Sequence, residues 1–107
     1  MSELKKLGIL NREGMRACNE GRPGDALFQL TQADSLARAL NSPLHEAKVR
    51  NSMALVYQMS GKYEEARVSF RIAAGRAVEG GGEGNALHRV IMRNLDCLTV
   101  QSKGRAA

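Results

Sequence analysis

The side chains that could do chemistry are few and lie far apart in the sequence. His45 and His88 are the two imidazoles, and Cys18 and Cys97 are the two thiols. Together they would supply four metal ligands, but a zinc site is usually nucleated by two ligands a few residues apart, and no two of these are so close. We therefore expect no metal site, and we expect both cysteines to be small core residues.

Two further patterns resemble parts of active sites without completing one. Glu64 and Glu65 are the one adjacent pair of carboxylates, at an expected helix start where acidic residues complement the helix dipole. The glycine cluster at 80–84 lacks the lysine and the hydroxyl residue of a phosphate-binding loop, and no strand precedes it. No GxSxG motif occurs. The sequence therefore predicts no catalytic residues and no cofactor, and we expect that the protein is not an enzyme.

The chain is basic, but its charges are dispersed. Sixteen Lys and Arg stand against eleven Asp and Glu, which gives a net charge of +5. The basic residues extend from Lys5 to Arg105 with one adjacent pair, Lys5-Lys6. Nucleic-acid-binding proteins usually concentrate positive charge on one face or stripe. A general preference for acidic partners is the expectation that follows.

Cysteine usage and hydropathy bear on the compartment. Cys18 and Cys97 lie near opposite ends of the chain and do not make a disulfide framework. No apolar run follows the N-terminal charges in the manner of a secretory signal, and no stretch approaches the roughly 20 apolar residues of a membrane span. We therefore expect a cytoplasmic protein with no membrane contact.

Helix-breaking residues divide the chain into five segments of helical length. The breaks lie at 21–24, 41–43, Gly61 and 80–84, and strand-favouring aromatic residues make up only 4% of the chain. Proline in the first break and the second can open the helix that follows. The sequence predicts a single all-α domain over residues 1–107. The expected helices cover residues 2–20, 23–40, 43–60, 62–79 and 85–102, and a flexible tail covers 103–107.

Sliding the sequence so that Gly21 falls on Gly61 superposes the first two segments on the next two. Small residues then fall on small residues, as expected where antiparallel helices approach closely. The other matched pairs are Gly14 and Ala54, Ala26 and Ala66, Leu30 and Phe70, and Ala33 and Ala73. We therefore expect two helical hairpins that share one packing register.

The second hairpin carries a family pattern. Residues 53–66, followed by Phe70 and Ala73, give a small residue, a Tyr three positions later, a Gly at the turn, an aromatic residue, and then Ala, Phe and Ala. This pattern resembles the tetratricopeptide repeat family. The usual repeat has about 34 residues. The step from Gly21 to Gly61 is longer, and in this respect the chain is similar to the longer repeats of kinesin light chain.

The resemblance implies both an architecture and a role. The architecture is a right-handed superhelical stack with one repeat at about 4–40, a second at about 43–79 and a capping helix at about 85–102. The role is that of a non-catalytic scaffold or adaptor, which binds a peptide or helix of a partner protein. In this family the first helix of each repeat lines a concave groove.

The shared register then predicts which residues line that groove. Apolar side chains would occupy its middle and basic ones its margin, which suits a peptide or amphipathic helix with some acidic charge. The candidates are Arg12, Met15 and Asn19 from the first helix, Lys48, Asn51, Ser52, Leu55 and Met59 from the third, and His88, Met92 and Leu95 from the fifth.

Two alternative functions stay open. The fifth segment is apolar over most of its circumference, and Met92 and Leu95 could join two copies of the chain in a homodimer. Arg38, Arg67 and Arg71 could form a basic stripe for nucleic acid on the outer face of the second helices. Aromatic side chains for base stacking are missing there, so nucleic acid is the less favoured partner.

Overall fold

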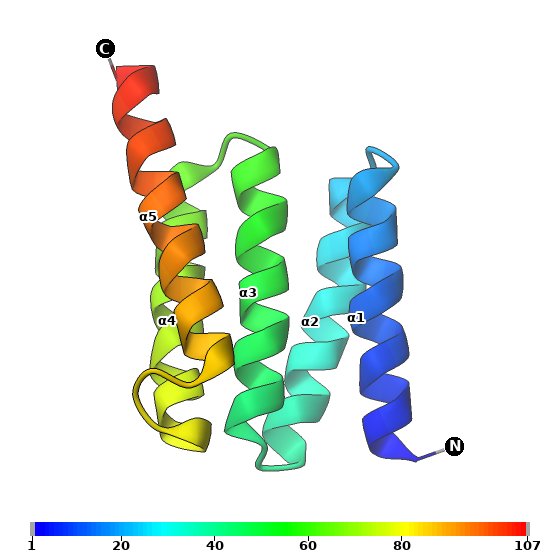
Figure 1. Ribbon diagram of the computed structural model, residues 1–107. Helices are drawn as coiled ribbons and strands as arrows, with labels where there is room; N and C mark the ends of the chain where they lie inside the picture. The colour runs from blue at the N-terminus through cyan, green and yellow to red at the C-terminus, as the bar shows by residue number, and fades with distance from the viewer. Residues whose placement is uncertain (1, 107) are drawn as a thin grey trace.

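The protein consists of α-helices joined by short connections (Figure 1). The computed structural model describes residues 2–106, and within this range it contains five helices and no strand. They are α1 (Glu3–Asn19), α2 (Pro23–Ala39), α3 (Pro43–Met59), α4 (Tyr63–Gly81) and α5 (Ala86–Ala106). The predicted all-α class is confirmed, and the first three helices match their predicted ranges to within one residue at each end.

Three similar turns space the first four helices evenly, so that α2, α3 and α4 begin at positions 23, 43 and 63. Each turn contains one residue with a positive φ angle, a conformation that commonly closes helices. These residues are Gly21 (φ 79°), Asn41 (φ 50°) and Gly61 (φ 78°). The next N–H bonds back into the helix in each case: Arg22 to the Ala17 carbonyl at 2.9 Å, Ser42 to Ala37 at 3.1 Å, and Lys62 to Tyr57 at 2.8 Å. The repeat of the sequence is therefore two helix-plus-turn units long.

Small residues form the contact between the two helices of each hairpin, as the repeat predicts. A methyl group added to Gly14 would lie 2.8 Å from Leu30 Cγ and 3.3 Å from the carbonyl oxygen of Ala26. Ala54 and Ala66, at the matched positions of the second hairpin, are fully buried. The side chains that the repeat superposes are thus the ones that let the helices approach.

Two clusters of buried apolar side chains meet at α3. The first cluster joins α1 and α2 to α3, and its α3 members are Val49, Met53 and Val56. The second joins α4 and α5 to α3, and its α3 members are Ala47 and Ala54. Because α3 supplies side chains to both clusters, the five helices form one packed body.

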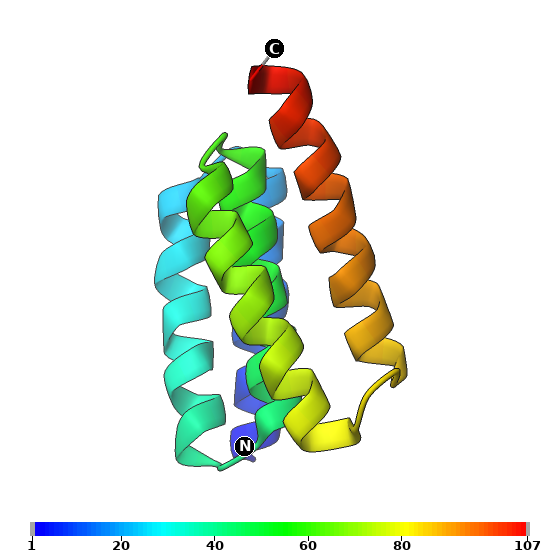
Figure 2. The same cartoon turned by 90° about the vertical axis from the view of Figure 1, so that its left-hand side faces the viewer.

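The helices lie on two sides of this body. α3 contacts each of the other four helices, whereas α2 and α4 do not contact each other within the described range. Figure 2 shows α2 and α5 on opposite sides of α3, with α4 crossing in front of α3. The odd-numbered helices follow one another in contact. A groove lies between α2 and α4, where a hollow of about 300 Å³ is lined by Arg38 of α2 and Arg76 of α4.

The connection into α5 breaks this even spacing. α4 continues through Gly80 and Gly81, two residues beyond its predicted end, and Gly82 and Gly84 then adopt positive φ angles of 81° and 74°. Asn85 begins the next helix, where its side-chain oxygen accepts a hydrogen bond from the backbone N–H of His88 at 3.0 Å.

α5 is also longer than predicted. It ends at Ala106 rather than at residue 102, and its last turns project beyond the other helices (Figures 1 and 2). Residues 103–106, expected to form a flexible tail, continue the helix past Gly104. Ala107 lies outside the described residues.

Candidate functional site

A shallow hollow of about 560 Å³ lies where α1 and α3 run side by side. Lys5, Gly8 and Arg12 contribute to it from α1, and Lys48 contributes from α3. Gly8 has no neighbouring atom within 4 Å of the place of a side chain, so this part of α1 is open. The hollow thus has three basic side chains around an open floor.

A second hollow, of about 280 Å³, lies between the beginning of α3 and the beginning of α5. Leu44 and Leu87 line it together with Ala86, and Lys48 lies at its margin. Lys48 is therefore shared by a basic hollow on one side and a more apolar hollow on the other. Among the described residues, no carboxylate lines either hollow.

The same side of α3 continues as an apolar surface. Leu55 lies seven residues beyond Lys48, and Met59 four residues further, so the three side chains project from one side of the helix. Leu55 is half-buried against the second cluster, whereas Met59 is 63% exposed. We call the surface made by Lys5, Gly8, Arg12, Leu44, Lys48, Leu55 and Met59 the α1–α3 face.

The predicted residues of α1 also lie on this side. Arg12 and Asn19 are exposed, and Met15 is half-buried against the first core cluster. Cys18 is buried behind them, with its Sγ 3.5 Å from Met59 Sδ, and this contact joins the end of α1 to the end of α3. Burial raises the pKa of the Cys18 thiol above its ordinary value.

Two predicted α3 residues serve the fold. Ser52 is buried, and its hydroxyl donates to the carbonyl of Lys48 at 3.2 Å. By helix geometry Ser52 lies about 40° from both Lys48 and Val56, at the edge between the α1–α3 face and the side of α3 that packs in the first cluster. Asn51 is half-buried and accepts a hydrogen bond from the Asn94 side chain of α5 at 3.0 Å.

The fifth helix presents a different side from the one predicted. Because Asn94 bonds to α3, its side of α5 faces α3. Met92 lies two residues before Asn94 and therefore about 160° away around the helix. Leu95 packs in the second core cluster, and His88 accepts a hydrogen bond from the N–H of Gly84 in the connection at 3.2 Å. His88 and Leu95 are therefore half-buried within the fold, and Met92 lies exposed on a side of α5 turned away from Asn94.

The glycine-rich connection explains this difference. The sequence repeat predicts that each inward-facing residue of α5 follows its counterpart in α3 by the same separation as Gly61 follows Gly21. In the structure this separation is two residues longer. The corresponding inward-facing residues are Val49, Met53 and Val56 of α3 and Ile91, Leu95 and Leu98 of α5. The side of α5 next to Asn94 instead carries Val90 and Cys97, both exposed. Cys97 was expected in the core but is exposed, and only a correct register for α5 could have placed these two residues.

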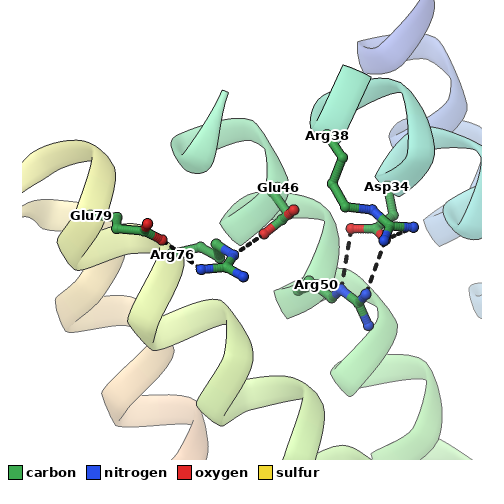
Figure 3. A network of polar contacts seen from close by, with 6 residues as sticks. All are labelled: Asp34, Arg38, Glu46, Arg50, Arg76 and Glu79. Carbon is green, nitrogen blue, oxygen red and sulfur yellow. Dashed lines mark hydrogen bonds and ion pairs between the residues drawn. The ribbon is translucent and has the colours of Figure 1, made fainter. Parts of the chain in front are cut away.

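The opposite side of the molecule carries a network of ion pairs (Figure 3). Asp34 of α2 is almost fully buried and accepts hydrogen bonds from Arg50 of α3 at 3.1 and 3.2 Å, while Arg38 lies 3.3 Å away. Glu46 of α3 pairs with Arg76 of α4. These pairs join α2 to α3 and α3 to α4 along the groove that α2 and α4 leave open.

Arg76 binds a second carboxylate as well. Its guanidinium donates to Glu79 at 2.6 Å, and the hydrogen bonds to Glu79 and Glu46 raise the pKa of Arg76. Arg67, part of the basic stripe considered for nucleic acid, pairs with Glu64, and Arg38 of that stripe pairs with Asp34. Positive charge on this side is thus matched by neighbouring acid at Arg38, Arg67 and Arg76, whereas Arg71 of the stripe forms no ion pair among the described residues.

The α1–α3 face differs in this respect. Within the described part of the chain, Lys5, Arg12 and Lys48 form no ion pair with any carboxylate. The positive charge of this surface is therefore available to a molecule that approaches from outside.

Comparisons with protein-family models, with curated proteins and with solved structures find no match to this chain. Among residues 2–106, no helix combines the length and the apolar character needed to cross a membrane.

Proposed function

We propose that the protein is a non-catalytic scaffold of the tetratricopeptide-repeat type, whose α1–α3 face binds an acidic, partly apolar segment of a partner protein. The distribution of ion pairs carries this proposal. Arginines along the groove between α2 and α4 are bound to carboxylates, whereas Lys5, Arg12 and Lys48 are not. Unmatched charge of one sign beside exposed apolar side chains favours a partner of the opposite sign.

The repeat architecture is the second part of the proposal. The even spacing of α1 to α4 and the matched small-residue contacts, Gly14 with Ala26 and Ala54 with Ala66, support two stacked repeats. In a right-handed superhelical stack, α1, α3 and α5 would line the concave side and α5 would cap the second repeat. The serial contacts of α1 and α5 with α3 agree with that arrangement.

The two hollows suggest how a segment would be held. Carboxylates of the partner would approach Lys5, Arg12 and Lys48 at the first hollow, while an apolar side chain would enter the second between Leu44 and Leu87. Met59, which is 63% exposed, offers a flexible apolar surface further along α3. Acidic groups alone would leave the apolar part of this face uncovered, so an amphipathic segment suits it best.

The test is selection from a displayed library of random peptides, followed by affinity measurement with charge-reversal variants. We expect selected peptides to be enriched in Asp and Glu interspersed with apolar residues, and to bind about tenfold or more weakly to Arg12→Glu and to Lys48→Glu. Arg71→Glu is the matched control, because Arg71 is an exposed arginine on α4. Peptides without acidic enrichment, or equal affinity for all three variants, would contradict the proposal.

A further inference from the structure

α5 carries a straight seam of exposed residues that its own fold does not use. The seam residues recur at alternating steps of four and three positions, which is the spacing that keeps one side of a helix facing a partner helix. Val90 and Val100 are 41% and 73% exposed. In chain order the seam is Ala86, Val90, Arg93, Cys97, Val100 and Gly104, and all six are exposed.

The inward side of α5 is separate from this seam. Ile91 and Leu98 are fully buried against α3 and α4, and the middle of the seam lies about 120° from them around the helix. A shallow hollow of about 380 Å³ lies over Cys97 and Val100. Because the last turns of α5 project beyond the other helices (Figure 2), a second helix can approach the seam there.

The seam reads almost the same in both directions. From either end it runs small residue, valine, a central pair of arginine and cysteine, valine, small residue. If two copies of α5 lie antiparallel with a two-fold axis level with Leu95, Val90 of each copy lies level with Val100 of the other. Ala86 then lies level with Gly104, and these small residues permit close approach. A two-fold interface requires such a self-complementary patch.

The charges favour the same arrangement. Within the described part of the chain, Arg93 and Asp96 form no ion pair, and both are exposed. In the antiparallel register Arg93 of one copy lies within one residue of the level of Asp96 of the other, and two-fold symmetry makes this pair twice. A parallel pairing would instead place Arg93 beside Arg93 and Asp96 beside Asp96, which repel.

We propose that the chain forms an antiparallel homodimer through the exposed seam of α5. The occupant of the seam is a second copy, because the order of residue types and the position of opposite charges match the seam to itself. The seam from Ala86 to Gly104 is about 27 Å long, so the contact is at the lower end of stable interface size and a dissociation constant in the micromolar range is expected. This dimer needs no ligand at the α1–α3 face, although Ala86 at the end of the seam also lines the hollow between α3 and α5.

Sedimentation of the pure protein over a range of concentrations tests the dimer. Val100→Glu should raise the dissociation constant about 100-fold or more, because it places a charge next to Val90 of the other copy at both symmetry-related contacts. Phe28→Glu is the control: Phe28 is exposed to a similar extent, 70%, but lies on α2. Arg93→Glu and Asp96→Arg should each weaken the dimer, and the double variant should regain most of the loss. A monomer mass up to about 1 mM, or equal effects of Val100→Glu and Phe28→Glu, would overturn the proposal.

Disulfide trapping tests the register directly, in a Cys97→Ser background. Val90→Cys and Val100→Cys variants should each fail to cross-link alone, but a mixture of the two should form a covalent heterodimer under mild oxidation, because only residues 90 and 100 lie level across the axis. Cross-linking of each variant with itself would show a parallel pairing and overturn the antiparallel one. No cross-link in the mixture, at a concentration where sedimentation shows dimer, would also overturn it.

Discussion

The contact at Gly14 leads to a prediction that separates close packing from helix propensity. A glycine inside a helix costs about 1 kcal/mol relative to alanine, so replacing it should stabilise a protein wherever there is room for a methyl group. Gly75 in α4 has such room, with no atom within 4 Å. Gly14 does not, because the added carbon would lie 2.8 and 2.9 Å from two carbons of Leu30.

The expected magnitudes follow from these distances. Carbon atoms pack best at about 3.5–4.0 Å, so the methyl group at position 14 would overlap Leu30 by well over half an ångström. Leu30 is fully buried, and the Ala26 carbonyl oxygen closes the other direction at 3.3 Å. Overpacking of this kind costs about 1–3 kcal/mol. Gly75→Ala should therefore raise the free energy of unfolding by about 1 kcal/mol. Gly14→Ala should be about 1–3 kcal/mol less stable than Gly75→Ala.

Urea unfolding followed by circular dichroism at 222 nm measures both variants against the parent protein. In thermal melts each kcal/mol corresponds to a shift of about 4–8 °C for a domain near this size. Adding Leu30→Val to Gly14→Ala provides space and should show a favourable coupling of about 0.5 kcal/mol or more. If Gly14→Ala stabilises the protein as much as Gly75→Ala does, α1 and α2 are not in close contact at this glycine and the shared register is incorrect.

Two further predictions concern the buried groups. Arg50→Leu should lower the free energy of unfolding by about 3 kcal/mol, because it leaves the buried Asp34 carboxylate with only the exposed Arg38. In urea unfolding, the double variant Asp34→Leu with Arg50→Leu should recover at least half of that loss. Equal losses in the single and double variants would argue against the pair. In a Cys97→Ser variant, Cys18 should react with Ellman's reagent about 100-fold or more slowly in the native than in the urea-unfolded protein, because it is buried. Equal fast reaction in both states would refute the buried position. Since burial raises the pKa of Cys18, the contribution of this thiol to stability is present below its ordinary pKa of about 9 and is lost as the pH rises through its pKa in the folded protein. The Cys18→Ala variant should therefore lose less stability at alkaline pH than the parent protein.

The helices α1 to α4 could be predicted because their ends have strong local causes. Gly21, Asn41 and Gly61 can adopt positive φ angles, and Pro23 and Pro43 open the helices that follow. These are local preferences that a sequence records directly. The packing register could be predicted too, since the small residues that permit close approach recur in both hairpins.

The register of α5 could not be predicted in the same way. Glycine is permitted both in the helix and in the turn, so the cluster at 80–84 does not determine where α4 ends. The structure places Gly80 and Gly81 in α4 and gives Gly82 and Gly84 positive φ angles. The inward side of α5 therefore depends on its packing against Ala77 and Phe70 of α4, which are distant in sequence.

The ion pairs were also absent from the sequence predictions, although one signal was present. Asp34 stands beside Ala33 in a helix whose other buried positions are small or apolar, and an acidic residue at such a position needs a basic partner. Its partner Arg50 lies on the next helix. The sequence contains both residues but does not show which arginine reaches which carboxylate, because that depends on how α2 and α3 are placed together.

The two sides of the molecule therefore use charge for different purposes. The pairs Asp34–Arg50 and Glu46–Arg76 each cross from one helix to another, so they contribute to the stacking of α2, α3 and α4. Arg12 and Lys48 form no ion pair with another helix among the described residues, and in water an exposed charge without a partner contributes little to stability. It follows that charge reversal at Arg50 should reduce stability, whereas charge reversal at Lys48 should leave unfolding unchanged and reduce only ligand affinity. A Lys48→Glu variant that unfolds as readily as Arg50→Glu would show that the α1–α3 face is part of the fold rather than a surface left free for a partner.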